Sequence, residues 1–280
     1  MPLFTSILCA TDGSNLARRV VRHAVALAAV MGARVTIVSY VSHDARGVEA
    51  AIAADVAALP LPQRAPDAVA IKVSTLAIGQ PVDAILNAAQ QQGHDLIVIG
   101  THSKSGISRW LLGSTSAALL EQAPCPTLLV PPGDLDIVAT GADGAKLVPG
   151  CVLAALDLDE PNDQQLVLAA RLADLARQPL VLMNVATPAK TDDAVRAGVL
   201  ARAVQAGISG RVARTVVARG EVASEIDRVA MAEHAGLVVM GLSRPDVRVP
   251  GAIADAVLKA RDALVLAVPA HAAAAPSATL

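Results

Sequence analysis

Short apolar runs alternate with amphipathic stretches along the first half of the chain. The apolar runs predict buried strands, and the stretches with apolar residues at helical spacing predict helices. The expected strands are 7–11, 34–41, 68–77, 95–100 and 126–131. The expected helices are 15–31, 47–59, 80–93 and 113–122. Alternation of this kind indicates a parallel sheet that is covered by helices on both faces.

The second half of the chain repeats this pattern. Its expected strands are 151–157, 180–186, 211–218, 236–241 and 263–268, and its expected helices are 163–177, 190–206, 221–234 and about 251–261. The segment DLIVIGTHSKSG (95–106) corresponds to AGLVVMGLSRPD (235–246), which gives an internal repeat of about 141 residues. We therefore predict an α/β protein with two tandem copies of a five-stranded parallel sheet of the Rossmann-like, nucleotide-binding type.

The composition changes between the two copies and again at the end of the chain. We assign residues 1–132 to a first domain and residues 150–269 to a second. The segment between them, 133–149, is glycine-rich and weakly periodic, which predicts a linker. Residues 270–280 form a low-complexity tail that we expect to be disordered.

Composition and charge argue against several classes of protein. A net charge of −2 gives no electrostatic basis for binding nucleic acid or an anionic membrane surface. Phe4, Tyr40 and Trp110 are the only aromatic residues, too few for a base-stacking surface. The sequence shows neither an uncharged apolar run of about 18 residues nor the basic start of a signal peptide. We therefore expect a cytoplasmic protein that binds neither nucleic acid nor membranes.

The cysteines Cys9, Cys125 and Cys151 are odd in number and have no paired spacing. This pattern predicts small core or strand-edge residues of a reducing compartment and no disulfide framework. A reactive thiol would need a nearby positive charge, which the sequence does not indicate.

Residues 97–116, IVIGTHSKSGISRWLLGSTS, carry the main candidate site. An apolar run stops at Gly100, and Gly113 then precedes Ser114, a good candidate for the N-cap of the following helix. Glycines let the backbone turn and approach a ligand closely, and first-turn N–H groups of a helix bind anions. Lys104 or Arg109 could add a charge-assisted contact. The stretch therefore predicts a phosphate site.

Two further segments are expected near this stretch. ATDGS follows the first strand, YVSH follows the second, and GTHSKSG follows the fourth. In open parallel sheets, ligands bind beyond the carboxyl ends of the strands, where the strand order reverses. The three segments are therefore expected to converge on one crevice.

The pattern Gly-x2-Gly-x9-Gly-Ser/Thr after a fourth strand, with ATDGS after a first, resembles the universal stress protein family. The internal repeat resembles its tandem-domain members, and LLGSTSAALLEQAPCPTLLV (111–130) is particularly similar to the family's pattern. The resemblance spans the whole chain in architecture, whereas the binding motif lies in the first 130 residues. It departs at Ser103, which stands where the second glycine of the motif belongs.

The ATP-binding branch of the family implies a role for each matching position. Asp12 would approach the ribose or the adenine, Ala10 would line the base pocket, and Val41 would meet the adenine edge through its backbone. The phosphates would be surrounded by Gly100, Thr101, His102, Ser103, Lys104, Gly113, Ser114 and Thr115. The implied cofactor is ATP, with or without Mg²⁺.

Simpler interpretations stand beside these roles. If the position of Ser103 requires a positive φ, the serine costs about 1 kcal/mol and favours an empty site. Asp12 followed by Gly13 and Ser14 could form only a turn and a helix cap. His102 fits a solvated loop residue better than an acid or a base.

The second copy is predicted to have lost the phosphate site. Arg244 replaces a motif glycine, the loop is about four residues shorter, and no Gly-Ser pair opens the next helix. Asp255 would place negative charge near the phosphates, although Asp157 and Val185 match Asp12 and Val41 of the first copy. A structural domain is the favoured interpretation, and a site for another anion at Arg244 and Arg248 is the alternative.

The resemblance implies a regulatory stress-response protein that binds an adenine nucleotide. No Gly-Lys-Ser/Thr phosphate loop is present, so at most weak ATPase activity is expected; a slow ATP hydrolase or a ligand-free association scaffold are the alternatives. Family domains pair through their fifth strands, so LVLAV (264–268) is expected to cover the strand edge of TLLVP (127–131). A homodimer of such chains and an unknown regulatory protein partner are also expected.

Overall fold

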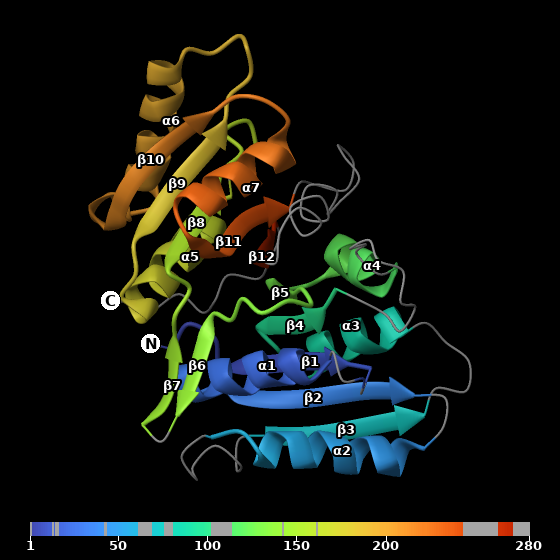
Figure 1. Cartoon of the computed structure of the whole chain (residues 1–280). Coiled ribbons are helices and arrows are strands. Elements are labelled where there is room, and N and C mark those ends of the chain that lie inside the picture. Colours follow the sequence, from blue (N-terminus) through green and yellow to red (C-terminus); the bar gives the residue numbers. More distant parts are fainter. Residues whose placement is uncertain are drawn as a thin grey trace.

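The computed structural model describes residues 2–12, 14, 17–41, 44–60, 69–75, 81–101, 114–141, 143–160, 162–242 and 263–270. The strands of the N-terminal half are β1 (Ser6–Thr11), β2 (Arg34–Val41), β3 (Val69–Thr75), β4 (Leu96–Gly100) and β5 (Thr127–Val130). Those of the C-terminal half are β8 (Cys151–Ala155), β9 (Leu180–Val185), β10 (Val212–Ala218), β11 (Ala235–Leu242) and β12 (Leu264–Pro269). Within these residues the strands form one sheet in the order β10-β9-β8-β11-β12-β5-β4-β1-β2-β3 (Figure 1).

Each half of the sheet has the same parallel topology. β1 pairs with β2 on one side and β4 on the other, so Ala10 lies between Val38 and Ile99. β8 has the equivalent place between β9 and β11, where Ala154 lies between Leu182 and Val239. The strand order therefore reverses beside β1 and beside β8. This confirms the predicted tandem α/β fold.

The two halves meet at an antiparallel seam between β5 and β12. Val265 pairs with Leu129 and Leu266 pairs with Leu128. All four side chains are buried, and β5 and β12 lie next to each other at the centre of the molecule (Figure 1). The expected cover of residues 127–131 by residues 264–268 is confirmed.

Helices cover both faces of the sheet and continue its core across the seam. One buried cluster joins the sheet to α1 (Ala17–Met31), α2 (Ala45–Ala57), α5 (Asp163–Ala176) and α6 (Asp192–Gln205). A second buried cluster, on the opposite face, includes α3 (Pro81–Gln91), α4 (Ser114–Gln122) and α7 (Val222–Ala232). A short 3₁₀ turn, η2 (Ser209–Arg211), precedes β10. The helix expected at about 251–261 lies outside the described residues.

The predicted linker contains a two-stranded hairpin. Its strands, β6 (Val138–Gly141) and β7 (Gly144–Leu147), pair antiparallel and pack against α1. Arg19 of α1 donates to the backbone carbonyls of Pro131 and Leu135, and its Nε lies 3.1 Å from Asp136 Oδ1. The connection between the halves is therefore bonded to the first helix.

The three cysteines are buried and free, as their sequence pattern predicts. Burial raises the pKa of Cys9 and of Cys125 to about 12 and that of Cys151 to about 11. Thiols with such pKa values stay protonated near neutral pH, so these side chains act as small core residues. None of the helices in the described part of the chain is long and apolar enough to cross a bilayer.

Candidate functional site

The carboxyl ends of β1, β2 and β4 lie side by side in the N-terminal half. Thr11 pairs with Ser39, and Ala10 pairs with Ile99, so Asp12, Val41 and Gly100 come to the same edge of the sheet. In open α/β sheets, ligands bind at this edge, where the strand order reverses. Contact of these residues with a nucleotide stays a prediction.

Asp12 is half-buried and shapes the turn that follows β1. Its Oδ1 accepts a hydrogen bond of 2.9 Å from the backbone N–H of Ser14. A carboxylate bonded two residues ahead stabilises a turn, as in the simpler sequence interpretation. Oδ2 has no hydrogen bond among the described residues and can accept one from a ligand.

Gly100 ends β4, and packing against α1 gives a structural reason for glycine beside the one that the motif indicates. Its φ is outside the left-handed region, so no sharp turn at this position demands glycine. A Cβ atom there would lie 3.0 Å from Cγ2 of Val20, which packs down from α1. Glycine therefore lets α1 approach β4, and the buried Thr101 continues the strand by donating its N–H to Val130 O at 3.3 Å.

Ser116 was not among the predicted site residues, yet it fixes the start of α4. Its Oγ donates a hydrogen bond of 3.0 Å to the backbone carbonyl of Gly100. The helix that begins at Ser114, with Thr115 as its second residue, is thereby held against the end of β4. The predicted site residues His102, Ser103, Lys104 and Gly113 lie outside the described residues.

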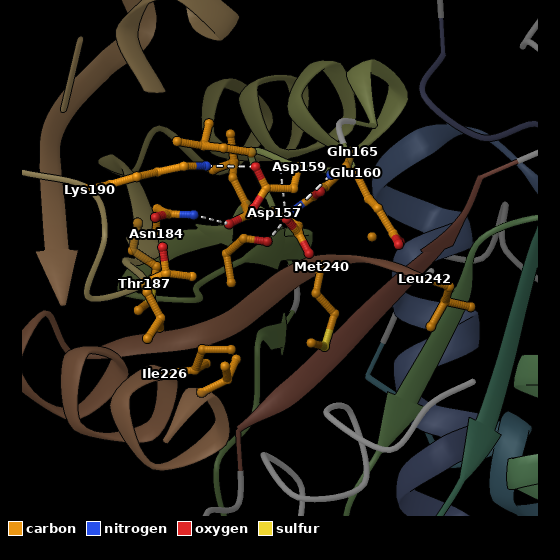
Figure 2. Close-up of a pocket in the computed structure, with 17 residues that line it drawn as sticks. Asp157, Asp159, Glu160, Gln165, Asn184, Thr187, Lys190, Ile226, Met240 and Leu242 are labelled. Carbon is orange, nitrogen blue, oxygen red and sulfur yellow. Dashed lines mark hydrogen bonds and ion pairs between the residues drawn. The ribbon is translucent and has the colours of Figure 1, made fainter. Parts of the chain in front are cut away.

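The C-terminal half, predicted to be only structural, has a cavity of about 170 Å³ at the equivalent edge. The cavity lies at the carboxyl ends of β8, β9 and β11 (Figure 2). Asp157, Val185 and Gly241, the counterparts of Asp12, Val41 and Gly100, all line it. The expected loss of phosphate binding stays a prediction, since it depends on Arg244 and Asp255, outside the described residues.

Two buried amide side chains form the polar wall of this cavity. Nδ2 of Asn184 donates to Leu156 O at 2.9 Å. Nε2 of Gln165 donates to Ala155 O at 2.7 Å and to Val239 O at 3.0 Å. Because the amide nitrogens are held by backbone carbonyls, each amide oxygen is turned away from those carbonyls.

Acidic residues form the rim of the cavity. Asp157 Oδ1 accepts from the backbone N–H groups of Asp159 and Glu160, at 2.9 and 3.3 Å. Lys190 Nζ lies 2.6 Å from Asp159 Oδ1, and Figure 2 shows this pair above Asp157. Among the residues that the structure describes, the rim therefore has three carboxylates and one ammonium group, and the ammonium group is already paired.

Apolar side chains complete the lining. Met183 comes from β9, Met240 from β11 and Ile226 from α7, and all three are buried. The cavity thus combines hydrogen-bond acceptors with an apolar wall. Sequence reasoning missed it because it judged the second copy by the phosphate motif. One residue in the sequence could have indicated the cavity: Asn184 is a polar residue within the apolar run LVLMNV of β9.

Comparisons with known proteins agree with this architecture. The model of the universal stress protein family matches residues 3–131. A universal stress protein of Thermus aquaticus is 33% identical over 140 residues, which span 46% of this chain and 99% of that protein. A universal stress protein of Methanocaldococcus jannaschii is 29% identical over 140 residues, covering 46% of this chain and 82% of that protein.

A solved structure extends the similarity over both halves. A universal stress protein of Archaeoglobus fulgidus matches with a TM-score of 0.67 and 17% identity, covering 95% of this chain and 98% of that one. At that identity the match supports the fold alone, including its tandem arrangement. The family match, the Thermus aquaticus relative and the repeated sheet together establish that this chain belongs to the universal stress protein family.

Proposed function

We propose that the chain is a stress-response protein that binds ATP or a related adenine nucleotide in its N-terminal half. The observation that carries the proposal is the convergence of Asp12, Val41, Gly100 and the start of α4 at one sheet edge. The free N–H groups at the start of a helix favour an anion, and Asp12 Oδ2 offers an acceptor to the ribose or the base.

The phosphate part of the proposal rests on the sequence motif. The spacing from Gly100 to Gly113 and Ser114 is that of the family's ATP-binding motif. A single helix-terminus contact stabilises an anion by only about 0.3–2 kcal/mol. Useful affinity therefore requires the loop 101–113, the start of α4 and burial of the base to act together.

Calorimetric titration with ATP and Mg²⁺ tests the proposal. We expect one site per chain, lost in Gly113→Val and weakened in Asp12→Ala. Asp157→Ala is a matched control, because Asp157 also accepts from the backbone N–H two residues ahead. Absence of binding by folded, nucleotide-free protein would refute the proposal and favour the association scaffold. Equal weakening by Asp12→Ala and Asp157→Ala would place the nucleotide elsewhere.

We further propose that nucleotide occupancy regulates association with a protein partner and that turnover of ATP is weak or absent. The internal β5–β12 seam uses the strand edge through which family domains pair, so a homodimer of chains would form through another surface. Light scattering with and without ATP tests both the dimer and its dependence on the nucleotide. A cytoplasmic location completes the proposal and is tested by fractionation of the cells that produce the protein.

A further inference from the structure

The cavity of the C-terminal half presents hydrogen-bond acceptors from residues that are almost wholly buried. Asn184 is 8% exposed and Gln165 is 3% exposed. Their nitrogens are occupied by backbone carbonyls, and neither amide oxygen has a hydrogen-bond partner within the described parts of the chain. Both oxygens remain reachable by solvent, so each can accept a hydrogen bond from a donor that enters the cavity.

Gln165 Oε1 lies directly beside the cavity wall. A Cβ atom at Gly241, which lines the cavity, would be 3.0 Å from this oxygen. The missing side chain at Gly241 therefore keeps the acceptor accessible from the cavity. Asn184 approaches the same space from β9, as the labelled side chains in Figure 2 indicate.

The charge around the cavity favours the same kind of ligand. Glu160 Oε2 is a buried carboxylate oxygen without a hydrogen-bond partner, and Asp157 uses only one of its oxygens in the turn. Lys190, the cation of the described lining, is paired with Asp159. An anion such as a phosphate would meet net negative charge at this rim, whereas a cation would be attracted.

Size and apolar lining limit the ligand further. A cavity of roughly 150 Å³ holds one benzene-sized molecule, and this one measures about 170 Å³. Met183, Ile226 and Met240 give it an apolar side that a bare metal ion would not use. No group of three or more histidine, cysteine, aspartate or glutamate residues suited to a metal occurs in the described part of the chain.

We infer that the cavity between β8, β9, β11 and α7 binds a small organic cation, a protonated amine with an apolar body. The ammonium group donates to the amide oxygens of Asn184 and Gln165 and faces the carboxylates of Asp157 and Glu160. The apolar body lies against Met183, Ile226 and Met240. This site is separate from the nucleotide site of the N-terminal half and does not depend on it.

Three probes of the same shape and different charge test the inference. Benzylammonium, benzyl alcohol and benzoate are titrated into the full chain at low salt and followed by ligand-observed NMR. A ligand of this size is expected to bind with a Kd of about 1 mM. We expect benzylammonium to bind at least about tenfold more tightly than benzoate, with benzyl alcohol between them. Equal binding of the three probes, or no binding of benzylammonium, would overturn the inference.

A double variant locates the binding. Asp157→Asn with Glu160→Gln keeps the size of both side chains and removes two charges from the rim, so benzylammonium should bind about tenfold more weakly. Asp193→Asn is the control, because this carboxylate lies on α6 with its side chain 98% exposed and does not line the cavity. Unchanged affinity in the double variant, or an equal loss in the control, would assign the binding to another surface.

Discussion

Acidification should weaken the folded state through His23, which is fully buried in α1. Its Nδ1 donates to Arg19 O at 2.8 Å, and Nε2 lies 3.5 Å from Asp136 Oδ1. Asp136 is already paired with Arg19 and Arg22, so little of its charge remains to stabilise an imidazolium ion. Burial, and then the positive charges of Arg19 and Arg22, lower the pKa of His23 to about 4.

The magnitude follows from that pKa. The unfolded chain has its ordinary histidine pKa of 6.5 and takes up the proton first, so protonation favours unfolding. Each pKa unit corresponds to about 1.4 kcal/mol. The stability that the neutral form of His23 contributes is almost fully present above pH 6.5 and is lost as the pH falls toward 4. The loss due to His23 is about 1.4 kcal/mol at pH 5.5 and about 2.5 kcal/mol at pH 4.5.

Urea unfolding between pH 7.5 and 4.5 measures this loss in the wild type and in His23→Gln. Glutamine stays neutral and retains an N–H donor, so the other titrating groups contribute equally to both proteins. Between pH 7.5 and pH 4.5, the free energy of unfolding of the wild type should therefore fall by about 2.5 kcal/mol more than that of His23→Gln. Parallel pH profiles of the two proteins would refute the burial argument.

Two further predictions concern the cysteines and one turn. At pH 8 the aromatic disulfide DTNB should not label Cys9, Cys125 or Cys151 of the folded protein within minutes, because only about 1 in 10⁴ to 1 in 10³ of these thiols is ionised. Unfolding should release three reactive thiols per chain. Rapid labelling of the native protein would contradict the high pKa values of the thiols. Gly150→Ala should lower the free energy of unfolding by more than Gly207→Ala does. The two glycines have nearly the same φ, 71° at Gly150 and 70° at Gly207. A Cβ atom at Gly150 would lie 2.7 Å from His234 O, whereas a Cβ atom at Gly207 would meet nothing within 4 Å. The strain common to both is of order 1–3 kcal/mol, and equal losses in thermal unfolding would show that the contact is relieved without cost.

The elements of this fold could be predicted largely from apolar periodicity. β2 begins and ends at the predicted residues 34 and 41, and α3 begins at Pro81, whose ring suits the first turn of a helix. The seam was predicted from family resemblance and is formed by the apolar strands 127–131 and 264–268. The β6–β7 hairpin was not predicted, because its short strands contain glycine and alternate only weakly.

The candidate sites show where sequence reasoning loses information. The strand order brings Asp12 and Val41 to one edge, which periodicity and a motif suffice to predict. The reason for glycine at position 100 depends on how closely Val20 approaches, which no local pattern encodes. The acceptors of the C-terminal cavity depend on which backbone carbonyls hold the nitrogens of Asn184 and Gln165. Those partners are distant in sequence and become known only from the fold.

The β5–β12 seam also determines how the protein responds to dilution. Two separate domains that pair through their fifth strands dissociate when their concentration falls below the dissociation constant. Here one polypeptide carries both strands, and a short connection gives them an effective concentration on the order of millimolar. The pairing therefore persists at any expression level. It always joins one N-terminal half to one C-terminal half, so each proposed nucleotide site of the N-terminal half is accompanied by one cavity of the C-terminal half.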